Sequence, residues 1–130
     1  MTFLIADERE ESRYAAYVDG RAAGYAEWIM VHGTVLVPRI EASPAYHGQG
    51  IGSMLLRRIL DDARAEGNTM LPLCPFAKRW TELHPEYLGT VRKPMPGEIA
   101  ALQSTLATAA ERRRSWFADP AAASPHTQPA

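Results

Sequence analysis

Residues 44–53 read Pro-Ala-Tyr-His-Gly-Gln-Gly-Ile-Gly-Ser, and this stretch separates a strand-rich region from a helix. Glycines at alternate positions remove side chains from a turn, so that a ligand can approach the backbone closely. The first amides of the following helix have no partners within the helix and carry the positive end of its dipole. The turn is therefore a candidate site for a phosphate or diphosphate. A glycine-rich turn without a ligand is the alternative, because short motifs often match by chance.

Two better-known phosphate loops fit this stretch poorly. A P-loop requires Gly-Lys followed by Ser or Thr, which is absent here. The dinucleotide fingerprint spaces its glycines as Gly-x-Gly-x-x-Gly behind a strand of a βαβ unit, whereas residues 48–52 read Gly-x-Gly-x-Gly. The strands before the turn also look antiparallel, which disfavours a nicotinamide-binding unit.

The residues before the turn predict an antiparallel meander. Strand formers dominate 13–18, 22–29 and 34–42, and the pairs Asp19-Gly20 and His32-Gly33 supply the turns between them. After the turn, apolar residues recur four apart, as on one face of an amphipathic helix: Ile51, Leu55, Ile59 and Ala63.

The pair Gly67-Asn68 is a typical helix stop. Beyond it, the sequence predicts three further elements. Residues 70–73 form a strand that a helical crossover would place parallel to the strand before the turn, 76–83 form a short helix, and 87–91 form an edge strand. The predicted fold class is α/β (α+β), with a mixed, mainly antiparallel twisted sheet flanked by helices.

Three segments follow from these patterns. Residues 1–95 form the main domain, and 96–117 form a C-terminal amphipathic helix with an apolar stripe. Residues 118–130 contain prolines and alanines with few large apolar side chains, and we expect them to be disordered.

Bulk composition excludes several classes of function. The chain has 130 residues, 46% of them apolar, and a formal net charge of -1, which gives no sign of a nucleic-acid-binding surface. No apolar run approaches the roughly 20 residues that span a bilayer. The acidic residues 7–11 are unlike a signal peptide, and the single cysteine, Cys74, excludes an intrachain disulfide. We expect a cytoplasmic protein, without a membrane partner or a metal site.

Residues 47–52 resemble motif A of the GNAT superfamily, the acetyl-coenzyme A-dependent N-acetyltransferases. Its pattern is Gln or Arg, two residues, Gly, one residue, then Gly or Ala, which maps to His47, Gly50 and Gly52, with His47 departing from the usual first residue. The resemblance implies acetyl-CoA as cosubstrate, an amine as acceptor, and a diphosphate on the amides of residues 48–53.

The stretches 73–76 (Leu-Cys-Pro-Phe) and 84–87 (His-Pro-Glu-Tyr) are similar to turns in a subfamily of very small GNAT-like proteins. Together with Glu41, this likeness covers residues 13–91. It implies that the strand 39–42 splays from its neighbour and pairs with the pantetheine arm of the cofactor. The implied cofactor-binding residues are Ile40, Ala42, His47, Gly48, Gln49, Gly50, Ile51, Gly52, Ser53 and Pro75.

Candidate catalytic residues follow from the same resemblance. Glu41 is the expected base, with a solvated strand residue as the alternative. Cys74 would accept the acetyl group, line the pocket or simply be a small core residue. Trp80 stands where larger members place a tyrosine acid, and tryptophan cannot act as that acid. Tyr87 is a substitute candidate, although it could equally be a packed strand residue, and His84 is expected to be a turn residue.

Two further functions remain open. One is a non-catalytic acetyl-CoA sensor, which the missing tyrosine supports. The other is an interaction domain or homodimer formed through the apolar stripe of Ile99, Leu102 and Leu106.

Overall fold

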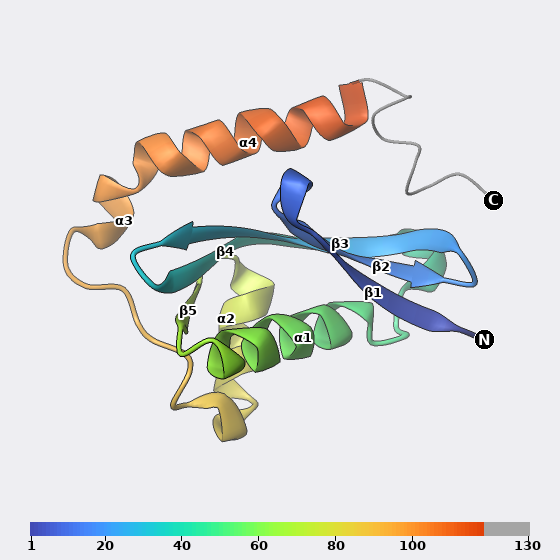
Figure 1. Ribbon diagram of the computed structural model, residues 1–130, viewed down its shortest axis with the longest axis horizontal. Coiled ribbons are helices and arrows are strands. Elements are labelled where there is room, and N and C mark those ends of the chain that lie inside the picture. The colour runs from blue at the N-terminus through green and yellow to red at the C-terminus, as the bar shows by residue number, and fades with distance from the viewer. Residues whose placement is uncertain (119–130) are drawn as a thin grey trace. The chain divides into compact units, whose positions relative to one another are not determined.

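The computed structural model describes residues 1–118, and the chain divides into two compact units, Met1–Lys93 and the residues from Pro94 onward. The first unit is built on a five-stranded sheet in the order β1-β2-β3-β4-β5 (Figure 1). The first four strands pair antiparallel and β5 pairs parallel with β4, which confirms the predicted fold class. The strands are β1 Phe3–Glu8, β2 Arg13–Val18, β3 Arg21–Val31, β4 Thr34–Ala42 and β5 Thr69–Pro72.

Both predicted hairpin turns are present. Asp19 and Gly20 join β2 to β3, and His32 and Gly33 join β3 to β4, all with positive φ between 48° and 82°. Such left-handed pairs match the twist of antiparallel strands. The sequence analysis assigned no strand to β1, which pairs with β2 along its whole length. Its side chains are exposed or half-buried, so the sequence shows little apolar alternation there.

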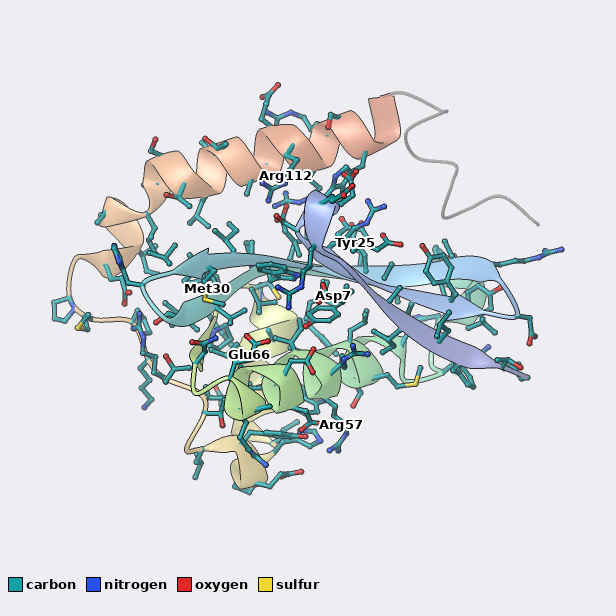
Figure 2. All side chains as sticks on the ribbon, viewed as in Figure 1. Asp7, Tyr25, Met30, Arg57, Glu66 and Arg112 are labelled. Atoms are coloured by element: carbon teal, nitrogen blue, oxygen red, sulfur yellow. The ribbon has the colours of Figure 1, made fainter. Side chains whose placement is uncertain are left out.

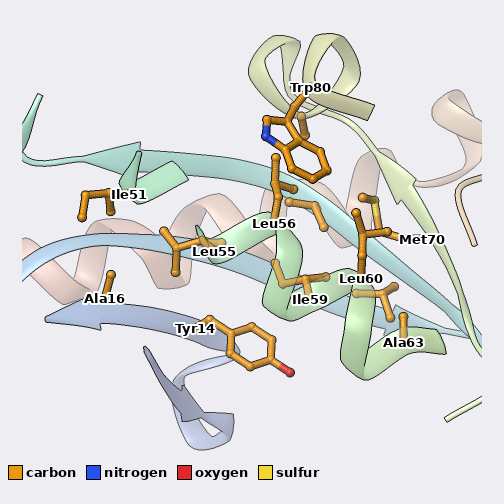
Figure 3. Packing of buried hydrophobic residues seen from close by; sticks show 14 of the residues in the cluster. Tyr14, Ala16, Ile51, Leu55, Leu56, Ile59, Leu60, Ala63, Met70 and Trp80 are labelled. Carbon is orange, nitrogen blue, oxygen red and sulfur yellow. The ribbon is translucent and has the colours of Figure 1, made fainter. Parts of the chain in front are cut away.

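Helix α1, Ile51–Ala65, lies along one face of the sheet (Figure 1). It ends before Gly67, whose φ of 74° gives the predicted stop. Its apolar stripe packs against side chains of β2 and β5 to form the core of this unit (Figure 3). The buried residues of α1 are Ile51, Leu55, Leu56, Ile59, Leu60 and Ala63. The period of the sequence therefore identified the correct face of this helix.

Helix α2, Pro75–Glu82, follows β5 and leads to a 3-10 turn, Pro85–Tyr87. The predicted edge strand over 87–91 is wrong. The backbone N–H groups of Thr90 and Val91 both donate to the carbonyl of Tyr87, at 2.9 and 3.0 Å, so the chain turns instead of extending. The segment meets the sheet at a single isolated bridge between Val91 and Met70, in which the N–H of Met70 donates to the carbonyl of Thr90 at 2.8 Å.

The second unit contains helices α3, Glu98–Ala101, and α4, Gln103–Ala118. The sequence predicted one continuous helix here, and the structure interrupts it at Leu102. The N–H of Leu102 is shared between the carbonyls of Glu98 and Ile99, at 3.0 and 3.1 Å, which tightens the last turn of α3. Apart from Ala118, which ends α4, the predicted disordered tail lies outside the described residues. No helix within residues 1–118 is long and apolar enough to cross a membrane.

Candidate functional site

Strand β4 is paired on both sides over its first half only. It pairs with β3 as far as Ala42, but its pairing with β5 stops at Val37 and Pro72. The last contact is the N–H of Leu73 donating to the carbonyl of Val37 at 3.1 Å. The parallel ladder ends there because β5 itself ends at Pro72 and the chain continues into α2. Residues 38–42 therefore have no partner on β5.

The glycine turn presents unpaired backbone donors at the start of α1. Gly48 and Gly50 have φ of 80° and 77°, a backbone conformation that residues with a side chain rarely adopt. The space around both is open, since a Cβ on either would meet no atom within 4 Å. Gly50 is the N-cap of α1 and no side chain caps the helix. Five backbone N–H groups make no hydrogen bond within residues 1–118: those of Gly48, Gly50, Ile51, Gly52 and Ser53. Such an open row of amides fits an anionic diphosphate.

Helix α2 packs directly against this turn. A Cβ on Gly52 would lie 2.9 Å from two ring carbons of Phe76, so any larger residue would require the ring to shift. One turn later, the indole N–H of Trp80 donates to the hydroxyl of Ser53 at 2.9 Å. The glycine turn and the Cys-Pro-Phe turn are thus neighbours in space. Cys74, the half-buried free cysteine that precedes α2, packs beside the core.

Another glycine, Gly24, lies where β3, β4 and α1 meet. Gly24 lies opposite Ala42 in the antiparallel ladder. A Cβ there would be 2.6 Å from the carbonyl oxygen of Glu41 and 2.9 Å from a methyl group of Ile51. The sequence analysis missed this residue. The available signal was a glycine inside a strand, which often marks a close backbone approach.

Glu41 lies in a cluster of polar side chains on the sheet face turned away from α1, because its neighbour Ile40 packs toward the core. Its carboxylate accepts a hydrogen bond from Tyr25 at 3.0 Å and pairs with Arg39, and its side chain is 44% exposed. Figure 2 shows Tyr25 on this face. Burial, together with the hydrogen bond to Glu41, raises the pKa of Tyr25 to about 12. Tyr25 and Arg39 contact this candidate base, and the sequence analysis singled out neither of them.

The other predicted cofactor residues occupy different environments. Ile40 is half-buried and Ala42 is exposed, both on the open half of β4. The N–H groups of His47 and Gln49 already donate to the carbonyls of Pro44 and Tyr46, both at 3.2 Å. Those two amides are therefore engaged within the turn, unlike their glycine neighbours. Pro75 is the first residue of α2.

Two aromatic residues take structural positions. Tyr87 is 5% exposed, its hydroxyl donates to Asp61 at 3.0 Å, and the guanidinium of Arg64 lies 4.9 Å from its ring. Asp61 is ten residues beyond the start of α1, which corresponds to about 15 Å along a helix. The structure therefore places the hydroxyl of Tyr87 away from the glycine turn. Trp80 is 6% exposed and its only polar hydrogen is directed at Ser53.

The fold and the glycine turn define a chain of the N-acetyltransferase class. The family model for GCN5-related N-acetyltransferases matches residues 13–90, and the chain belongs to this family. The solution structure of a GCN5-like putative N-acetyltransferase from Staphylococcus aureus superposes with a TM-score of 0.58 at 20% identity, covering 71% of this chain and 90% of that chain.

A second solved structure is more distant. The crystal structure of the ribosomal-protein-S18-alanine N-acetyltransferase from Escherichia coli gives a TM-score of 0.43 at 22% identity, covering 52% of this chain and 39% of that chain. No curated protein matches the chain. The family and the fold together support acetyl transfer as the general class of activity.

Proposed function

We propose that this protein transfers an acetyl group from acetyl-CoA to an amine by direct attack. The observation that carries the proposal is the row of amides at the start of α1 that make no hydrogen bond within residues 1–118, those of Gly48 and of residues 50–53. Those donors suit the diphosphate of the cofactor. Beside them, residues 38–42 of β4 have no β5 partner, so an extended pantetheine arm has free strand backbone to pair with.

In the proposed reaction, the amine nitrogen attacks the thioester carbonyl carbon. A C–N bond forms, the C–S bond breaks, coenzyme A leaves as a thiolate, and the amine gives a proton to a base. Glu41 is the proposed base because its carboxylate is exposed on the open half of β4. Tyr25 remains protonated at neutral pH and holds this carboxylate as a hydrogen-bond donor. Cys74 lines the pocket and forms no bond in this pathway.

Thermal denaturation tests the cofactor assignment. Acetyl-CoA should raise the melting temperature, because a ligand that binds only the native state stabilises it. Gly50→Glu should abolish this shift by placing a side chain and a negative charge in the amide row. Gly67→Glu is the matched control, since Gly67 has a similar φ of 74° and a similarly open surrounding at the other end of α1. An equal loss of the shift in both variants would contradict the assignment.

Turnover with a library of amines tests the chemistry. Release of free coenzyme A should depend on the amine, and Cys74→Ser should retain substantial activity. A kinetically competent acetyl group on Cys74 would overturn direct attack while leaving the cofactor assignment in place. Binding of acetyl-CoA without turnover on any amine would instead identify a sensor. The hydrogen bonds of Trp80 to Ser53 and of Tyr87 to Asp61 favour this alternative, since neither residue supplies an acid at the glycine turn.

A further inference from the structure

Trp80 packs against the first turn of α1. Its indole N–H donates to the hydroxyl of Ser53 at 2.9 Å, and its ring stacks on His84, with centroids 3.6 Å apart and planes at 11°. The Nδ1 atom of His84 lies 2.7 Å from the carbonyl oxygen of Trp80, so this nitrogen carries the proton and donates. The guanidinium of Arg57 lies 5.3 Å from the indole centroid. Figure 3 shows the indole over α1 near Leu56.

The direction of this hydrogen bond determines what the hydroxyl of Ser53 can do. An indole N–H only donates, whereas a serine hydroxyl has one hydrogen and two lone pairs. The bond from Trp80 therefore occupies a lone pair and leaves the hydroxyl hydrogen of Ser53 available for another acceptor. The backbone N–H of Ser53 makes no hydrogen bond within the described part of the chain. Ser53 thus offers two donors at the same end of α1.

We propose that Trp80 is a positioning residue for the cofactor diphosphate. Through its N–H it holds the hydroxyl of Ser53 so that this hydroxyl and the Ser53 amide donate to the same phosphate. Trp80 itself does not touch the cofactor. This inference rests on the proposed function. It assigns a positioning role to the indole at the position where larger family members place a tyrosine acid.

Calorimetric titration with acetyl-CoA and with S-acetylpantetheine, which lacks the diphosphate, separates positioning from general packing. Trp80→Phe removes the N–H and keeps an aromatic ring. Its dissociation constant for acetyl-CoA should rise about 2- to 12-fold, the range for one hydrogen bond, while that for S-acetylpantetheine stays unchanged. In turnover, KM for acetyl-CoA should rise and kcat should not change.

Variants of Ser53 make the test independent of the tryptophan. Ser53→Ala should weaken acetyl-CoA binding at least as much as Trp80→Phe, and Ser53→Thr, which keeps the hydroxyl, should restore it. The double variant with Ala at 53 and Phe at 80 should bind no more weakly than Ser53→Ala alone, because both changes remove one interaction.

Trp28→Phe is the matched control, because the buried indole N–H of Trp28 has no hydrogen-bond partner within residues 1–118. It should leave both dissociation constants unchanged. If Trp80→Phe weakens both ligands equally, or neither, while the wild type binds acetyl-CoA, the positioning role is overturned and the proposed function stands. If the wild type does not bind acetyl-CoA, the proposed function fails and this inference fails with it.

Discussion

The two halves of β4 differ although they belong to one continuous strand. Residues 34–37 are buried and pair with β5, residues 34–36 pair with β3 as well, and Val35 and Val37 belong to the core under α1. Residues 38–42 are half-buried or exposed, and of these residues 39–42 pair with β3 alone. The buried half anchors the strand, and the open half has one edge without a strand partner. Function and stability should therefore respond separately to substitutions in the two halves.

The largest effect is expected for Glu41→Gln in the open half. If Glu41 is the base, turnover should fall by about 10²- to 10⁴-fold, mainly below the pKa of the acceptor amine, where a proton must be removed first. The free energy of unfolding should change by about 1 kcal/mol or less, because the Arg39 pair is partly exposed. Steady-state kinetics over pH and urea titrations measure the two quantities. Unchanged turnover on every acceptor would show that Glu41 is not the base. Glu10→Gln, on the exposed turn before β2, is the control and should leave turnover unchanged.

Gly24→Ala should disturb stability and binding together, because its Cβ would press on the carbonyl of Glu41 and on Ile51 at once. Overpacking costs about 1 to 3 kcal/mol, and the upper end is expected because the nearer neighbour is backbone. Acetyl-CoA binding should weaken as the end of β4 moves relative to α1. Gly89→Ala, where a Cβ meets nothing within 4 Å, should change neither property. Urea titration with and without acetyl-CoA measures the free energy of unfolding and the stabilisation by the ligand. If Gly24→Ala changes neither, the contacts between β3, β4 and α1 can adjust to a Cβ at this position.

Val37→Ala in the buried half should lower the free energy of unfolding by about 2 kcal/mol, from two lost methyl groups and the cavity that they leave. Val37 is fully buried in the core cluster. Because the open half is untouched, kcat and KM of the folded protein should stay close to wild-type values. A large drop in kcat below the unfolding transition would show that the two halves are coupled more tightly than their pairing suggests.

The smallest effect is expected for Tyr25→Phe at alkaline pH. The folded protein raises the pKa of Tyr25 to about 12, above the ordinary value near 10, so the unfolded phenol ionises first. The stability that this group contributes is present below pH 10 and is lost as the pH rises toward 12. Tyr25→Phe should therefore flatten part of the decline in urea midpoint between pH 9.5 and 11.5. An unchanged slope would show that other tyrosines account for the decline.

Local patterns in the sequence predicted most of the elements of the first unit. The hairpin pairs at 19–20 and 32–33 require positive φ, and the apolar period of α1 requires one buried face, so both follow from near neighbours. The edge strand β1 was missed, because it is defined by its pairing with β2. The strand predicted over 87–91 was wrong, because the N–H groups of Thr90 and Val91 share the carbonyl of Tyr87 and close a turn there. The roles of the predicted catalytic and cofactor residues stay predictions.

The glycine turn was determined by sequence alone, because only glycine accepts its backbone and leaves its amides uncovered. The tertiary structure decided which residues surround it. Phe76 and Trp80 reach Gly52 and Ser53 across more than twenty residues of chain, and Gly24 meets Glu41 across a strand pair. No local pattern encodes such contacts, since they depend on how α2 and β3 pack against α1 and β4. The sequence therefore specified the glycine turn with its uncovered amides, and the packing of distant elements specified which side chains stand around it.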